Sequence, residues 1–101
     1  MKFIWDDRKN RSNLRKHGLD LSDSVPMFDG PMLASPDTRE EYEEERWIGI
    51  GVTHGRVVVV AFAERGENCI RIISLRKANQ RERKLFEEAI ADELEEGRFP
   101  S

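Results

Sequence analysis

The spacing of apolar and polar residues divides the chain into a polar, helical N-terminal part, a middle rich in β-forming residues and a helical C-terminal part. Residues 2–5, Lys-Phe-Ile-Trp, predict a short strand. A polar helix is expected over residues 7–17, with Asp6 suited to its N-terminal cap and Gly18 to its C-terminal cap. Leu14 is the clearest apolar anchor of this helix.

A second, weaker helix is expected over residues 21–28, where apolar residues recur at helical spacing and Ser22 is the candidate cap. Pro26 has no backbone N–H to donate, so this helix should be short or distorted. The chain is then expected to be extended over residues 32–35, and residues 37–44 form a charged loop.

Three strands are expected in succession, over residues 46–53, 56–63 and 69–75. The dipeptide His54-Gly55 between the first two is a signal for a tight hairpin. Consecutive short strands joined by short turns imply an antiparallel meander. The middle strand is nearly continuous in valine, which predicts that it is buried on both faces.

The last element is an amphipathic helix, in which Asn79 and Glu82 have the spacing of a capping box. Its apolar residues form one stripe that should pack on the sheet: Ala78, Leu85, Phe86, Ala89, Ile90 and Leu94. Gly97 should end it. The expected fold is α+β, with a strand and two helices, an antiparallel meander and a C-terminal helix on the sheet. We expect one domain over residues 1–96 and a loose end over 97–101.

Composition narrows the class of protein. The chain has one cysteine, Cys69, so no intramolecular disulfide can form, and nothing indicates a secreted, disulfide-rich fold. Residues 1–7 lack the apolar core of a signal peptide, and the longest apolar run, residues 57–63, is too short to cross a bilayer. A cytoplasmic protein is therefore expected.

The net charge of −3 argues against a nucleic-acid partner, but the charges are segregated along the chain. Residues 2–17 carry six Lys/Arg against two Asp, and residues 76–84 carry five against one Glu. The acidic residues gather in residues 37–46 and 87–96. If the basic stretches meet in space, they form a local anion site. The alternative is that each is a solvated helix face.

Arginines gather at the expected strand ends, with Arg46 before the first meander strand and Arg65 after the second. In the third strand, strict alternation places Arg71 among Ile73 and Leu75, where it needs an anionic partner or solvent. Guanidinium groups bind phosphate through paired hydrogen bonds, so such a cluster suits an RNA backbone. The alternative is that the arginines form structural pairs with Glu45, Glu64 or Glu82.

His17 is the better of the two histidines for proton transfer, because an unperturbed imidazole titrates near neutral pH. Lys16 beside it could stabilise charge on a phosphate. The alternative is that His17 simply ends a helix. Glu45 and Glu64 are candidate general bases for attack of a ribose 2′-hydroxyl on the adjacent phosphate, which needs a base, an acid and positive charge but no metal. No zinc-ligand spacing or phosphate-binding glycine loop is present in the sequence.

Four segments, in order, resemble the BrnT family of toxins. They are residues 3–6 with 13–18, residues 25–31, residues 45–47 with Gly51, and residues 70–78 with 81–83. The likeness covers about residues 3–86. The chain departs from the family pattern at Pro26, where a helix former is usual, and at Phe86, where tyrosine is often found.

The resemblance implies a fold related to RelE-type ribonucleases and growth arrest through RNA cleavage. It also implies neutralisation by a BrnA-like antitoxin with a ribbon-helix-helix part, in a heterotetramer that contacts operator DNA only through the antitoxin. The implied site residues are Lys16, His17, Glu45, Arg65 and Arg76 for catalysis and Arg46, Arg71, Arg81 and Arg83 for RNA binding. No metal or cofactor is expected. Two alternatives remain, a non-catalytic co-repressor module that binds the antitoxin and an interaction domain of no toxin system.

Overall fold

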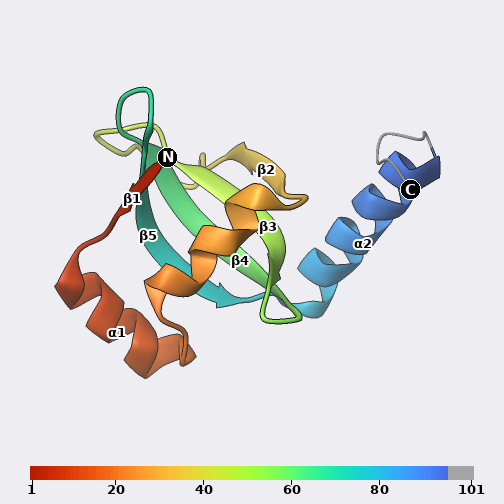
Figure 1. The fold of residues 1–101 in the computed structure, drawn as a ribbon, viewed down its shortest axis with the longest axis horizontal. Coiled ribbons are helices and arrows are strands. Elements are labelled where there is room, and N and C mark those ends of the chain that lie inside the picture. Colours follow the sequence, from red (N-terminus) through yellow and green to blue (C-terminus); the bar gives the residue numbers. More distant parts are fainter. Residues whose placement is uncertain (96–101) are drawn as a thin grey trace.

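A computed structural model describes residues 1–95 as a five-stranded sheet with helices packed on it and beside it (Figure 1). The elements in chain order are β1 (Lys2–Ile4), α1 (Asp7–His17), the 3-10 helix η1 (Leu21–Asp29), β2 (Leu33–Pro36), β3 (Trp47–Thr53), β4 (Arg56–Glu64), β5 (Cys69–Lys77) and α2 (Gln80–Glu95). In these described residues no helix has the length and apolar character needed to cross a membrane. The expected helix end at Gly97 and the expected loose end over residues 97–101 lie outside the described residues.

The expected α+β class is confirmed, but the sheet is mixed and not purely antiparallel. The strand order is β1-β5-β4-β3-β2. The meander from β2 to β5 is antiparallel throughout, while β1 runs parallel to β5, with Phe3 opposite Ile70. The hairpin between β3 and β4 is confirmed, since His54 and Gly55 have the positive φ angles of 50° and 73° that a tight two-residue turn requires.

The caps of the two N-terminal helices follow mostly from local sequence. The Asp6 carboxylate accepts hydrogen bonds from the backbone N–H groups at the start of α1, which lower its pKa, and Gly18 ends the helix with a φ of 69°. The second helix is distorted as expected, a 3-10 helix with Pro26 inside it. Its cap is Asp20 and not Ser22, because Asp20 and Asp23 form a reciprocal capping box.

The expected apolar anchor of α1 is wrong. The side chain of Leu14 is 41% exposed, whereas Asn13 is buried. The Asn13 amide donates hydrogen bonds to the carbonyl oxygens of Leu19 and Leu75, both at 2.8 Å, and accepts one from the Leu75 N–H at 3.0 Å. A buried polar residue therefore joins α1 to the edge of β5.

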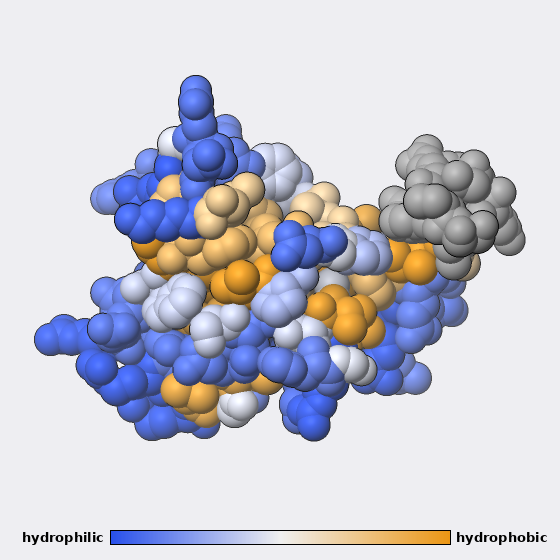
Figure 2. Space-filling model, viewed as in Figure 1, coloured by the Kyte–Doolittle hydropathy of each residue, from blue (hydrophilic) through white to orange (hydrophobic). Residues whose placement is uncertain are grey.

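The first face of the sheet carries the main core, under η1. Its buried residues are Leu19, Leu21, Met27, Val58, Val60, Phe62, Ile70, Ile72 and Leu75. Gly49 and Gly51 of β3 let η1 and the following residues approach closely, because a Cβ at Gly49 would overlap Met32 and one at Gly51 would lie 3.1 Å from Met27 Cε. Figure 2 shows this side of the molecule, with hydrophilic residues over α1 and apolar residues gathered over the middle.

A β-bulge at Ile73 interrupts the alternation of β5, because the register with β4 skips that residue. Leu75 is consequently fully buried on the first face with Ile70 and Ile72, and the expectation that it shares a face with Arg71 is wrong.

The same bulge brings three polar side chains of β5 together on the second face of the sheet. Arg71, Ser74 and Arg76 each pair with a β4 residue whose side chain points to that face. Part of the face is covered by the first turns of α2, where Phe86 packs with Ile50 and Val59. In Figure 1 the rest of α2 extends away from the sheet. The uncovered part of the second face is where the charged side chains collect.

Candidate nucleic-acid interface

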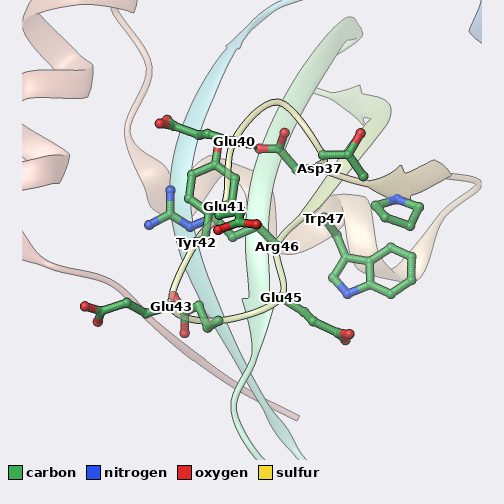
Figure 3. Close-up of a pocket in the computed structure, with 11 residues that line it drawn as sticks. Asp37, Glu40, Glu41, Tyr42, Glu43, Glu45, Arg46 and Trp47 are labelled. Atoms are coloured by element: carbon green, nitrogen blue, oxygen red, sulfur yellow. Dashed lines mark hydrogen bonds between the residues drawn. The ribbon is translucent and has the colours of Figure 1, made fainter.

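Five arginines lie on the second face, and we call them the arginine face. Arg39, Arg46, Arg65 and Arg71 line its hollows, and Arg76 lies near Arg39 without lining them. Arg39 and Arg46 belong to the loop between β2 and β3, Arg65 directly follows β4, and Arg71 and Arg76 belong to β5. Figure 3 shows the loop between β2 and β3, residues 37–46, passing across neighbouring strands, with the side chains of Tyr42 and Arg46 beside one another. Segments far apart in sequence thus bring their positive charge to one place.

Asp37 anchors the start of the loop. It is 8% exposed, and its carboxylate accepts hydrogen bonds from Arg39 Nε at 2.9 Å, Arg39 Nη2 at 2.8 Å and the Tyr42 hydroxyl at 3.2 Å. Chiefly because of the Arg39 hydrogen bond, the pKa of Asp37 falls to about 2. The carboxylate is therefore ionised near neutral pH and holds both Arg39 and Tyr42 in place.

Arg46 lies at the centre of the site, with its guanidinium carbon 4.0 Å from the centre of the Tyr42 ring. This cation–π contact orients the guanidinium without neutralising it. Its Nε is buried and has no hydrogen-bond partner among the described residues. A buried donor without an acceptor is costly, so Arg46 is suited to receive an anionic ligand.

Arg65 and Arg71 share one carboxylate, that of Glu44. Glu44 Oε2 lies 3.1 Å from Arg65 Nε, and Glu44 Oε1 contacts Arg71 Nη2. The Arg71 side chain is only 17% exposed, and its Nε is also buried without a partner in the described part of the chain. The need of Arg71 for an anionic partner is confirmed, but the partner is neither Glu45 nor Glu64.

Arg76 forms a bidentate salt bridge with Glu82, in which both nitrogen–oxygen distances are 2.8 Å. The pair raises the pKa of Arg76 and lowers that of Glu82, in each case mainly through these hydrogen bonds. Glu82 also accepts from the Asn79 N–H, and Asn79 accepts from the Glu82 N–H, which confirms the expected capping box. Arg76 is thereby fixed to the start of α2.

Two adjoining hollows make the arginine face a cleft. One, of about 530 Å³, is lined by Glu41, Tyr42, Glu43, Glu44, Arg46, Arg65 and Arg71. The other, of about 350 Å³, is lined by Asp37, Arg39, Glu40, Tyr42, Arg46, Ala61, Ile73 and Ser74. Tyr42 and Arg46 line both, so the two hollows form one cleft. A larger hollow of about 780 Å³ is lined by the loop itself and by five of its glutamates, which makes it a poorer place for phosphate.

Several of the expected site residues lie elsewhere. Lys16 and His17 are exposed in the last turn of α1 and do not line the cleft. Glu45 is exposed and lines the larger hollow. Arg81 and Arg83 are exposed on α2, where Arg83 lines a separate hollow. Of the expected residues, the structure thus brings Arg46, Arg65 and Arg71 together in the cleft, and Arg76 lies beside it near Arg39.

Sequence reasoning missed Arg39, Tyr42 and Glu44. Tyr42 is the single tyrosine of the chain and the one aromatic residue in an acidic loop, which is a usable signal. Glu44 could not be selected over its neighbours Glu43 and Glu45, because only the path of the loop decides which of the three faces the arginines. In residues 1–95, no group of three or more His, Cys, Asp or Glu side chains is arranged to hold a metal ion.

The fold and the cleft define a class: a small α+β domain that gathers arginine guanidinium groups in a cleft on one face of its sheet. The family model described as the ribonuclease toxin BrnT of type II toxin–antitoxin systems matches residues 5–82, so the chain belongs to the BrnT family. The matched segment contains all five residues of the arginine face. The sequence resemblance to this family is thereby confirmed.

A solved structure agrees with this assignment. The chain is similar to the crystal structure of the ribonuclease toxin BrnT from Brucella abortus, with 33% identity and a TM-score of 0.61, over 79% of this chain and 99% of that one. No curated protein matches the sequence. Membership of a type II toxin family implies that the chain has a cognate antitoxin.

Proposed function

We propose that this chain is an endoribonuclease that binds RNA across the arginine face and cleaves it by attack of a ribose 2′-hydroxyl on the adjacent phosphate. The observation that carries the proposal is the meeting of Arg46, Arg65 and Arg71 in one cleft of a chain of the BrnT family. Charge that develops on the phosphate during the attack would be stabilised by guanidinium groups already in position. The reaction requires no metal.

Proton transfer needs groups near the phosphate. The cleft supplies the Tyr42 hydroxyl, which Asp37 orients. Phe86, at the position where the family often has tyrosine, is 5% exposed and packs against the sheet. We therefore place the hydroxyl of this site on Tyr42. Lys16, His17 and Glu45 remain candidate proton-transfer groups from the sequence, and they would act only on RNA that extends beyond the cleft.

The proposed partner is a BrnA-like ribbon-helix-helix antitoxin, bound in a cytoplasmic heterotetramer that reaches operator DNA through the antitoxin. A non-catalytic co-repressor is the second candidate. It is favoured by one observation, that four of the five arginines of the face already contact a carboxylate. In that case replacement of Arg71 or Arg76 by alanine should change complex formation, and no RNA should be cut.

The test is expression of the wild-type chain with and without its antitoxin, followed by incubation of the purified protein with RNA in excess EDTA. We expect growth arrest that the antitoxin relieves, and cleavage in EDTA that leaves 2′,3′-cyclic phosphate ends. Wild-type protein that affects neither growth nor RNA contradicts the proposal. Cleavage that EDTA abolishes and added metal restores contradicts the metal-free reaction.

A further inference from the structure

The contact between Glu44 and two arginines of the cleft has a consequence for ligand binding. We propose that Arg65 and Arg71 form the binding site of one RNA phosphate, and that the Glu44 carboxylate occupies this site until RNA displaces it. The inference rests on the proposed function, because it names the group that binds and what controls its access. Its ligand class is a phosphodiester or another phosphate group.

The geometry matches one anionic group replacing another. Glu44 presents one oxygen to Arg65 and the other to Arg71, which is how the two anionic oxygens of a phosphate would bridge the same pair. The carboxylate leaves Arg71 Nε buried and without an acceptor. A phosphodiester has two anionic oxygens, as the carboxylate has, and its two ester oxygens are weaker additional acceptors within reach of the same group.

The other acidic partners of the arginine face, Asp37 and Glu82, each make a second contact that holds another part of the fold. Asp37 has a side chain only 1% exposed and also binds Tyr42. Glu82 caps α2 as well as binding Arg76. Glu44 lies outside any helix or strand, between the exposed residues Glu43 and Glu45. Its side chain can therefore swing out without disrupting an element of the fold.

The charges of the site also favour replacement of the Glu44 carboxylate by an RNA phosphate. With Glu44 in place, Arg65, Arg71 and Glu44 sum to one positive charge, and when Glu44 leaves, the two guanidinium groups present two. Ion pairs that solvent reaches contribute little stability, and Arg65 is 53% exposed. A polyanion that also contacts Arg46 gains from several phosphates at once and displaces the carboxylate, whereas a single free phosphate competes weakly.

The test compares Glu44→Gln with Glu67→Gln in the full chain. Glu67 is exposed in the turn between β4 and β5 and lines neither hollow of the cleft. Both variants remove one negative charge, but only the first removes a contact to the arginines. The probe is a single-stranded 2′-O-methyl RNA oligonucleotide, which cannot supply the attacking hydroxyl. We expect Glu44→Gln to tighten binding about tenfold, which corresponds to about 1.4 kcal/mol. Glu67→Gln should change it less than about twofold, as expected of an exposed charge screened by salt.

A double variant tests whether Glu44→Gln tightens RNA binding through its contact with Arg65. When Arg65 is already replaced by alanine, Glu44→Gln should gain clearly less than it does in the wild-type background, because one of the two competing contacts is gone. Thermal unfolding shows which variants are folded. Glu44→Ala, for which tighter RNA binding is also expected, replaces Glu44→Gln in the binding test if the glutamine variant does not fold.

The outcomes separate this inference from the proposed function. Equal tightening in Glu44→Gln and Glu67→Gln would mean a general charge effect, and weaker binding in Glu44→Gln would mean that the carboxylate supports Arg71. Either result overturns the inference. If the wild type cleaves RNA while these results are found, the ribonuclease proposal stands alone. If Glu44→Gln tightens binding but no variant cleaves RNA, the phosphate site stands and the ribonuclease proposal fails.

Discussion

Replacement of Arg46 by alanine is expected to slow RNA cleavage by about 100-fold or more, the usual effect of losing one group that stabilises developing charge. Arg46 lines both hollows of the cleft, stacks on Tyr42 and has a buried Nε without a partner in residues 1–95. It is also the member of the arginine face for which the described residues offer no carboxylate contact. Its charge is therefore the one most available to RNA.

Two further variants test whether the loss of cleavage in Arg46→Ala is specific to the arginine of the cleft. Arg46→Lys keeps the charge but loses the planar fork and the stacking, so an intermediate loss of about tenfold is expected. Arg56→Ala removes an exposed arginine from the turn side of β4, outside the cleft, and should leave the cleavage rate nearly unchanged. Single-turnover cleavage rates measure all three. Equal rates for Arg46→Ala and Arg56→Ala would place the reaction elsewhere on the protein.

Asn13→Ala is expected to give the largest loss of stability, about 3 kcal/mol in the free energy of unfolding. The Asn13 amide makes three buried hydrogen bonds. Its removal leaves both the N–H and the carbonyl of Leu75 without these hydrogen-bond partners. Each buried polar group left without a partner costs about 1–3 kcal/mol. Because these bonds join α1 to β5, the loss affects the packing of two elements at once.

Leu14→Ala is the matched control for this prediction, since helical patterning alone would make Leu14 the anchor of α1. Its 41% exposure leaves little burial to lose, so a cost below about 1 kcal/mol is expected. Urea unfolding of the two variants gives the comparison. A larger loss in Leu14→Ala than in Asn13→Ala would show that α1 is held by apolar packing after all.

Local signals in the sequence predicted most of the fold. The caps at Asp6, Gly18 and Asn79, the turn at His54 and the distortion at Pro26 all depend on residues close in sequence, and each is confirmed. The parallel pairing of β1 with β5 was not predictable in this way, because it joins segments about 67 residues apart and no local pattern specifies the partner.

The bulge at Ile73 shows why the site was harder to predict than the fold. The run Ile72-Ile73-Ser74 contains nothing that marks an interruption of a strand, yet the skipped residue moves Leu75 into the core and sets Ser74 beside the cleft. Arginines at strand ends were correctly expected to converge. The proton-transfer candidates Lys16 and His17 follow from residue type and from the family resemblance, neither of which gives a position in space, and the fold places them outside the cleft.

The central claim is that RNA binds across the arginine face, and the side-chain Nε–Hε signals of the arginines test it most directly. In an NMR titration of the wild-type chain with a 2′-O-methyl RNA oligonucleotide, we predict the largest shifts for Arg46, Arg65 and Arg71. Arginines of α1 and α2, such as Arg11 and Arg83, should change little. Shifts confined to those helices, with the three cleft arginines unchanged, would contradict the account.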